Sequence, residues 1–222
     1  MPTTRITRFG FVNAYLVTED DGLTLIDTTL KGGGKAILAA AEQLRAPIVR
    51  ILLTHGHTDH VGALDELAHQ LPQAEVLISA RDARPLAGDK TTDPGEPSGK
   101  LKGGWPKVAT VPGRLLQPGD TIGSLVAHAA PGHTPGQLAF LDPRDGTLYC
   151  GDAYSTLGGM ATSAKANPLF PLPVMATWDK PTALETAKAL RALDPQALAP
   201  GHGKVVTSPG AAMDAAIRKA GG

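Results

Sequence analysis

Cysteine is nearly absent from this sequence, since Cys150 is the only one among 222 residues. A single cysteine excludes an internal disulfide framework and is typical of a reducing compartment. The first residues show no charged stretch followed by an apolar core, and no apolar run reaches the length of a membrane span. We therefore expect a cytoplasmic protein without a membrane partner.

The sequence also has no excess of one charge and few aromatic residues. The 21 basic and 21 acidic residues cancel, and aromatic residues make up only 4% of the chain. No basic run occurs and no aromatics alternate with arginine or lysine, so we expect no nucleic-acid partner. Gly32, Gly33 and Gly34 lack the spacing of a phosphate-binding loop, and no Gly-x-Ser-x-Gly segment indicates a serine nucleophile.

Apolar residues, by contrast, reach 42%, enough to bury the core of a single domain over residues 1–222. Their spacing predicts a hairpin over residues 9–26, later strands over 48–53, 75–79, 124–129, 138–141 and 147–152, and helices over 35–44, 61–71, 182–193 and 209–219. Thr182 and Glu185 have the spacing of a capping box. Residues 84–113 are irregular and rich in proline and glycine, which indicates either a functional loop or lid or a surface insertion.

The sequence is organised around His55, His57, Asp59 and His60, which follow the apolar run of residues 48–53. These four side chains lie in a turn at the C-terminal end of a predicted buried strand, where open α/β sheets place their ligands. His55 and His57 can hold one cation, and Asp59 and His60 can reach a second. Imidazole with carboxylate suits zinc, iron, manganese or nickel rather than calcium. The pattern predicts a metal site.

Three further candidate ligands stand where later predicted strands end: His133, Asp152 and His202. Cys150 is expected to be a buried thiol rather than a ligand, and His69 and His128 are expected to be structural. Asp27 ends the second hairpin strand. We expect it either to hydrogen-bond the turn that carries His55 and His57, without binding metal itself, or to serve in capping or turn formation.

Taken in order, His55-x-His57-x-Asp59-His60, His133, Asp152 and His202 resemble the ligand pattern of the metallo-β-lactamase superfamily. The resemblance implies an α/β fold of αββα type, a sandwich of two mixed β-sheets flanked by helices with a binuclear site at one edge. Carried over by position, one metal would be held by His55, His57 and His133, and the other by Asp59, His60 and His202, with Asp152 as the bridge. The repeated Gly-His-Thr at residues 56–58 and 132–134 also suggests two related halves, residues 1–115 and 116–222, with residues 84–113 as a loop insertion.

Asp152 and the residues after it distinguish this sequence from several branches of the family that it resembles. The β-lactamases of the family lack a bridging aspartate. Glyoxalase II and the persulfide dioxygenases continue after Gly-Asp with a Gly-Arg segment, which residues 153–159 do not contain. The resemblance therefore implies a binuclear metal-dependent hydrolase of lactones or thioesters.

In such a site two divalent ions about 3.5–4 Å apart share a bridging hydroxide that attacks the carbonyl carbon. Zinc is the first expectation, with iron, manganese or nickel as alternatives, and the substrate is expected to be a small ester, lactone or thioester. A phosphodiesterase or nuclease on the same metals, a mononuclear iron enzyme acting on a persulfide, and a binding module without turnover are the rival interpretations. The sequence gives no decisive sign of oligomeric state.

Three residues are candidates for catalysis. Asp59 and Asp152 are expected to carry protons during hydrolysis. Tyr154 stands two residues after Asp152 and is expected to donate a hydrogen bond to the developing oxyanion, as a tyrosine does in lactonases of the family. The alternative for Tyr154 is packing beside the site. The loop at residues 84–113 is expected to border the site, with Trp105 as an apolar contact.

Overall fold

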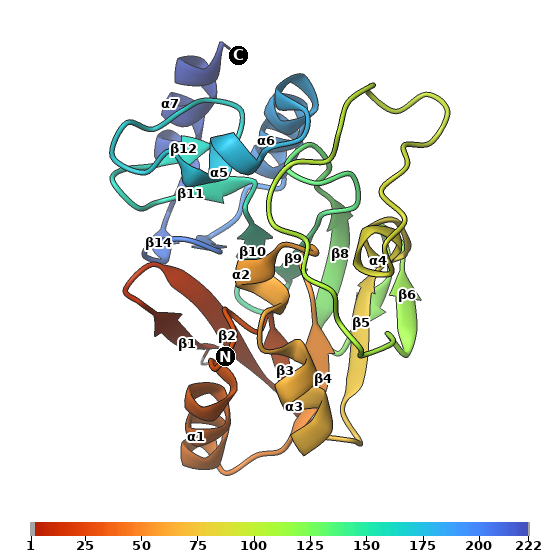
Figure 1. Ribbon diagram of the computed structural model, residues 1–222. Helices are drawn as coiled ribbons and strands as arrows, with labels where there is room; N and C mark the ends of the chain where they lie inside the picture. Colours follow the sequence, from red (N-terminus) through yellow and green to blue (C-terminus); the bar gives the residue numbers. More distant parts are fainter. Residues whose placement is uncertain (1–2, 222) are drawn as a thin grey trace.

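Two six-stranded sheets lie face to face in this computed structural model, which describes residues 3–221, and helices cover both outer sides (Figure 1). The first sheet has the order β1 (Thr3–Arg8), β2 (Val12–Glu19), β3 (Gly22–Ile26), β4 (Ile48–Leu52), β5 (Glu75–Ser79) and β6 (Arg114–Leu116). The second has the order β14 (Val206–Thr207), β13 (Ala197–Pro200), β10 (Thr147–Gly151), β9 (Leu138–Asp142), β8 (Leu125–Ala129) and β7 (Thr121–Ile122). Each sheet contains parallel and antiparallel pairs. The predicted αββα sandwich is therefore confirmed.

Three apolar cores follow from the alternation of side chains along the buried strands. On β4, Ile51 packs towards the first layer of helices and Leu52 packs between the sheets. On β10, Leu148 packs towards the second layer of helices and Tyr149 packs between the sheets. Successive residues of a strand point to opposite faces, so strands that are apolar at every position can serve two cores at once.

The helices divide between the two outer faces. The first face carries α1 (Gly34–Leu44), α2 (Thr58–Val61) and α3 (Leu64–Gln70), and the second carries α6 (Lys180–Ala192) and α7 (Gly210–Ala220). The shorter helices α4 (Ala80–Leu86) and α5 (Leu172–Ala176), and the small pair β11 (Tyr154–Ser155) and β12 (Ala161–Thr162), complete the described elements. Among residues 3–221, no helix has the length and apolar character needed to cross a membrane.

Two expectations about local structure need correction. The cap of α6 is Asp179, whose carboxylate accepts the backbone N–H of Thr182 at 2.9 Å, so Thr182 lies inside the helix. The irregular segment also begins later than residue 84, because α4 runs to Leu86. Arg84 lies within α4 and forms ion pairs with Asp89 and Asp93, so side chains of this helix hold the start of the loop.

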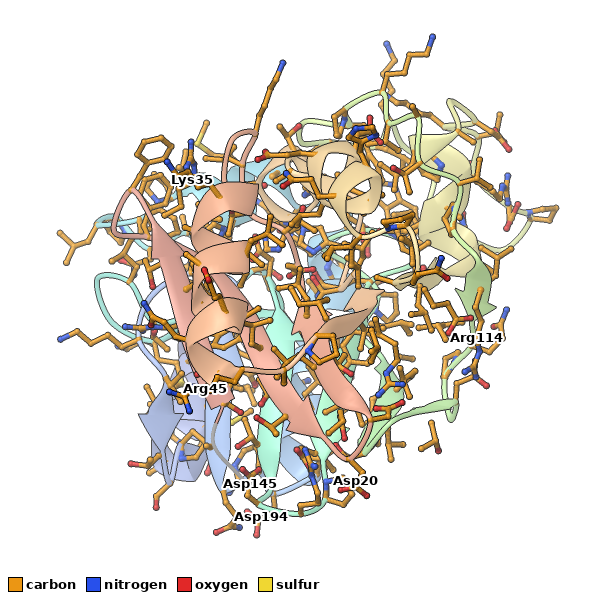
Figure 2. The ribbon with its side chains drawn as sticks, turned by 90° about the horizontal axis from the view of Figure 1, so that it is seen from below. Asp20, Lys35, Arg45, Arg114, Asp145 and Asp194 are labelled. Atoms are coloured by element: carbon orange, nitrogen blue, oxygen red, sulfur yellow. The ribbon has the colours of Figure 1, made fainter. Side chains whose placement is uncertain are left out.

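Each half of the chain supplies one sheet. The first sheet ends at Leu116 and the second begins at Thr121, close to the boundary expected near residue 115. A common origin of the two halves stays a prediction. Residues 54–60, which carry the first histidines, follow the C-terminal end of β4. The turns that contain Asp20, Asp145 and Asp194, labelled in Figure 2, lie at the opposite end of the strands. Arg144 binds the carbonyl of Thr18 there at 3.0 Å and so connects the two sheets.

Candidate metal centre

The metal turn, residues 54–60, is bonded to both sheets. The carbonyl of Thr54 accepts the N–H of Leu138 at the start of β9, at 2.9 Å. Asp27 lies at the end of β3 and accepts the N–H of Thr54 at 2.8 Å. The other carboxylate oxygen of Asp27 lies 2.8 Å from Nδ1 of His60. Asp27 therefore orients the turn from outside, which is the first of the two roles expected for it.

The structure brings all seven candidate ligands together in two groups. In each group the ligand atoms lie within 4.8 Å of one another: His55, His57 and His133 form the triple-histidine group, and Asp59, His60, Asp152 and His202 form the mixed group. Asp152 stands between the groups, since one oxygen lies 3.3 Å from Nε2 of His60 and the other lies 3.5 Å from Nε2 of His133. The grouping is the one that the family resemblance implied.

In each of the five histidines, one ring nitrogen faces away from the other ligands and contacts a group that is not a ligand. We call this nitrogen the outer one and the other nitrogen the inner one. These pairs are His55 with Thr54 Oγ1 (3.0 Å), His57 with the Lys102 carbonyl (3.0 Å), His60 with Asp27 (2.8 Å), His133 with Thr177 Oγ1 (3.0 Å) and His202 with the Phe11 carbonyl (3.0 Å). Carbonyls and carboxylates only accept, so the outer nitrogens donate to them. The hydroxyl of Thr177 donates to the Pro173 carbonyl at 2.8 Å, which leaves its oxygen free to accept from His133. In the neutral form of each ring the lone pair is therefore on the inner nitrogen, where a divalent metal ion can bind it.

Buried polar atoms without hydrogen bonds support a cation at this place. His55 Nε2, His60 Nε2 and Asp152 Oδ1 are buried and form no hydrogen bond within the described chain, although the last two face each other at 3.3 Å. Buried polar groups are seldom left unpaired, because the loss of water costs free energy. Two imidazole nitrogens and a carboxylate oxygen that converge in this way fit divalent metal ions of the zinc or iron type.

The triple-histidine group is neutral in the metal-free chain. Burial lowers the pKa of His57 to about 4 and the pKa of His133 to about 3. Burial, with the neighbouring histidines, also holds the pKa of His55 well below its usual range. Neutral imidazole is the form that binds metal ions.

The mixed group is charged instead. Burial alone would raise the pKa of Asp59, but His60 and His202 outweigh it and bring this pKa to about 2. Burial would lower the pKa of His202, but the adjacent Asp152 raises it to about 10. Without a metal, protons on the imidazoles thus balance the buried carboxylates. A divalent ion would take over this role and release those protons.

Asp82 is a residue of the site that the sequence analysis missed. Its carboxylate is fully buried and accepts the N–H of Gly56 (3.1 Å), the hydroxyl of Thr134 (2.7 Å) and the N–H of Gly136 (2.7 Å). It therefore ties the turn of His55 and His57 to the turn of His133. The sequence shows only an acidic residue three positions after the predicted strand over 75–79, which does not reveal its partners.

The irregular loop also belongs to the site. Besides the Lys102 carbonyl on His57, the carbonyl of Gly104 accepts the N–H of Thr58 at 2.8 Å. The ring of Trp105 lies edge-on to that of His57, with 4.9 Å between centroids. Residues 102–105 thus form one wall of the metal centre, as expected for a loop that borders it.

The role expected for Tyr154 does not agree with the structure. Its side chain is fully buried against α6, where the hydroxyl donates to the carbonyl of Ala187 at 2.7 Å. The chain turns at Gly151, whose φ is +50°, and β11 then pairs Tyr154 with Thr162. Tyr154 is therefore a packing residue, which was the alternative. Cys150 is buried and lies outside both ligand groups, as expected.

A pocket of about 290 Å³ opens onto the two ligand groups. Its floor is formed by ligands from both groups, and its walls are Gly103 and Gly104 on one side and α5 on the other. Asp59 is the most accessible of the ligands, with its side chain 32% exposed, while His60 and Asp152 are almost fully covered. Asp59 is therefore the ligand that a small molecule in the pocket meets most readily.

Comparisons with known proteins agree with this geometry. The sequence profile of the Metallo-beta-lactamase superfamily matches residues 7–202. An uncharacterized protein of Bacillus subtilis, YobT, is 50% identical over 210 residues, which are 94% of this chain and 90% of that protein. The probable metallo-hydrolase YflN of the same organism is 28% identical over 223 residues, covering 92% of this chain and 83% of YflN.

A partial relative and a solved structure complete these comparisons. The hydroxyacylglutathione hydrolase of Nostoc is 31% identical over 121 residues, so the match covers 52% of this chain and 40% of that enzyme. The crystal structure of TTHA1623 in a di-iron-bound form superimposes with a TM-score of 0.70 at 26% identity, covering 96% of this chain and 97% of that protein. Sequence profile, relatives and fold agree, and this chain belongs to the metallo-beta-lactamase superfamily.

Proposed function

We propose that this metal-dependent hydrolase cleaves ester-like bonds, in a lactone or a thioester, with two divalent ions bound at the two ligand groups. The observation that carries the proposal is the split of seven ligands into groups of three and four, with Asp152 between them. Five of the seven, from both groups, line an open pocket. Seven ligands exceed the number that one tetrahedral ion uses. Zinc is the first candidate metal. Iron is the alternative suggested by the di-iron form of TTHA1623.

Bound divalent ions in such sites lower the pKa of water and polarise a carbonyl oxygen. The residues of this chain add orientation and proton handling. Asp59 is the accessible carboxylate of the mixed group and lies 3.3 Å from Nε2 of His202. It is therefore placed to accept a proton from the attacking water and to pass it to the leaving group, while the buried Asp152 holds the two groups together.

Water is the nucleophile that this pocket favours. Among the described residues that line it there is no serine, threonine, cysteine, lysine or tyrosine, so no side-chain hydroxyl, thiol or amine faces the substrate. The carboxylates and imidazoles that do line it are the candidate metal ligands, so no other side chain is placed to form a covalent intermediate. Hydrolysis by water alone is consistent with a lactone or a thioester. The partial match to a hydroxyacylglutathione hydrolase supports a thioester as one substrate class.

The test is a substrate screen on protein of known metal content. We expect about two equivalents of metal after gentle purification, and hydrolysis of lactones, thioesters or both. The His133→Ala variant should lose about one equivalent and at least 100-fold in kcat/KM. The His128→Ala variant is the matched control, because His128 lies in β8 outside both ligand groups, and it should keep both metals.

Other outcomes would contradict the proposal. Turnover of phosphodiesters but of no ester would make the chain a phosphodiesterase on the same metals. A reproducible single equivalent of iron, with oxygen consumed in the presence of a persulfide, would favour the oxygenase instead. Two metals without turnover of any substrate would favour a binding role.

A further inference from the structure

We infer that α5 recognises an uncharged, apolar group of the substrate, so the preferred esters or thioesters carry a neutral hydrocarbon chain. This inference rests on the proposed hydrolase function and specifies its substrate class. Four residues of α5 line the pocket above the metals: Leu172, Pro173, Met175 and Ala176. We call them the apolar rim.

Two residues of the apolar rim, Leu172 and Met175, are exposed. Leu172 is 52% exposed and Met175 is 67% exposed, although both border a polar, ligand-rich floor. Together with Leu169, they place three of the seven exposed large hydrophobic residues of the described chain within residues 169–175. Exposed apolar side chains that gather beside a pocket indicate a surface that a ligand covers.

The apolar character continues to the metal ligands. The ring of Phe170 lies 5.1 Å from that of His202, and the ring of Phe11 lies 6.0 Å from Phe170. Trp105 lies against the ring of His57, which lines the pocket. A hydrocarbon chain attached to a carbonyl at the metals would therefore meet apolar surface as it leaves the floor.

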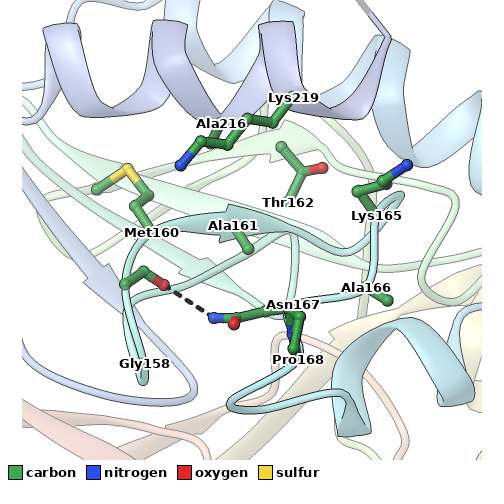
Figure 3. Close-up of a pocket in the computed structure, with 11 residues that line it drawn as sticks. Gly158, Met160, Ala161, Thr162, Lys165, Ala166, Asn167, Pro168, Ala216 and Lys219 are labelled. Carbon is green, nitrogen blue, oxygen red and sulfur yellow. Dashed lines mark hydrogen bonds between the residues drawn. The ribbon is translucent and has the colours of Figure 1, made fainter.

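Charge points in the same direction. No lysine or arginine is among the described residues that line this pocket, and its only charged groups are ligands. A substrate with free carboxylates, such as a glutathione thioester, would find no lysine or arginine there to pair with them. A cavity of about 330 Å³ between α7 and β12 does carry Lys165 and Lys219 (Figure 3), but it shares no lining residue with the metal pocket. The lysines of that cavity therefore do not serve a substrate at the metals.

The experiment compares a series of neutral thioesters and esters with acyl chains of two to ten carbons. We expect kcat/KM of the wild-type protein to rise about two- to fourfold per methylene until the chain extends past the rim. In Leu172→Ser and Met175→Ser, the rise per methylene should be smaller, and metal content should stay at the wild-type value. Inhibition by alkyl methyl ketones, which carry the chain but no scissile bond, should follow the same order.

The matched control is Leu115→Ser. Leu115 is 54% exposed, nearly the same as Leu172, but lies on β6 at the edge of the first sheet. Its substitution removes an equal exposed side chain away from the pocket and should leave the dependence on chain length unchanged.

The outcomes separate this inference from the function on which it rests. If no ester, lactone or thioester is hydrolysed, the proposed function itself fails. If short esters are hydrolysed but chain length has no effect, or if hydroxyacylglutathione is preferred to a neutral thioester, the hydrolase stands and the apolar rim does not select the substrate. If Leu172→Ser instead dissociates an oligomer and leaves the chain-length dependence intact, the rim is an interface between copies of this chain, and the inference is overturned.

Discussion

Asp82 shows how much one buried carboxylate contributes to the arrangement of the ligands. Three donors from two distant turns converge on it, and its side chain has no contact with solvent. Burial outweighs these hydrogen bonds and raises the pKa of Asp82 to about 6. The folded protein therefore holds a proton on Asp82 more tightly than the unfolded chain does.

This shift predicts a pH dependence of stability for Asp82→Asn. Because the folded pKa lies above the unfolded one, the contribution of Asp82 to stability is greatest below about pH 4 and decreases as pH rises through about 6. The stability difference between wild type and Asp82→Asn should thus be larger at pH 4 than at pH 7, by up to about 3 kcal/mol. Urea unfolding of both proteins without metal measures it. A difference that grows with pH would contradict the assignment.

A second prediction for a single residue concerns Tyr154, whose substitution should lower stability and leave activity almost unchanged. Tyr154→Phe removes the hydrogen bond to the Ala187 carbonyl and should lower the free energy of unfolding by about 0.5–1.5 kcal/mol. Metal content should remain near two equivalents and kcat should change less than about twofold, because the hydroxyl faces α6 and not the pocket. A large loss of kcat with both metals retained would restore the role that the family resemblance implied.

Among the elements, the loop over residues 87–113 does more than border the pocket. Its Lys102 carbonyl fixes the orientation of His57. Gly103 has a φ of +79°, and a Cβ at this position would overlap the imidazole of His57. Only glycine allows the loop to approach the ligand this closely. We therefore expect the loop to influence metal binding, in addition to the influence on substrate choice that its position predicts.

Gly103→Ala should lower metal occupancy of the triple-histidine group, by about tenfold or more in affinity. Gly95→Ala is a matched control in the same loop. Its φ is +89°, so it suffers the same backbone strain, but nothing lies within 4 Å of the added Cβ. Metal competition with a chromophoric chelator measures both variants. Equal losses in the two would assign the effect to backbone strain alone.

The elements that could be predicted from the sequence are those with local causes. The apolar runs of β4 and β10 define buried strands, and the ligands follow directly where those strands end. The groups that orient the ligands could not be predicted, because Thr177 and Lys102 reach the site only through the path of long loops. The role predicted for Tyr154 was wrong, because beyond the turn at Gly151 its hydroxyl donates to the Ala187 carbonyl of α6 and not towards the ligands.

At the scale of the whole molecule, each ligand group takes side chains from both halves of the chain, so bound metals would connect the two sheets. The metals would bind the folded protein and not the unfolded chain, so removal by a chelator should lower the melting temperature. At a free metal concentration 1,000 times the dissociation constant, the stabilisation is about 4 kcal/mol, which corresponds to about 8–16 °C for a chain of this size. Calorimetry with and without chelator measures it. An unchanged melting temperature would show that the site is not occupied under those conditions.

The division of the ligands between the halves has a consequence for fragments of this protein. Residues 55–60 supply four of the ligands from the first half, and His133, Asp152 and His202 come from the second. Neither half holds a complete group. The first half has His55 and His57 of the triple-histidine group but not His133, and the second half has His133 alone. Two polypeptides cut between β6 and β7 would therefore bind metal tightly only after reassociation, and metal uptake would act as a reporter of fragment complementation.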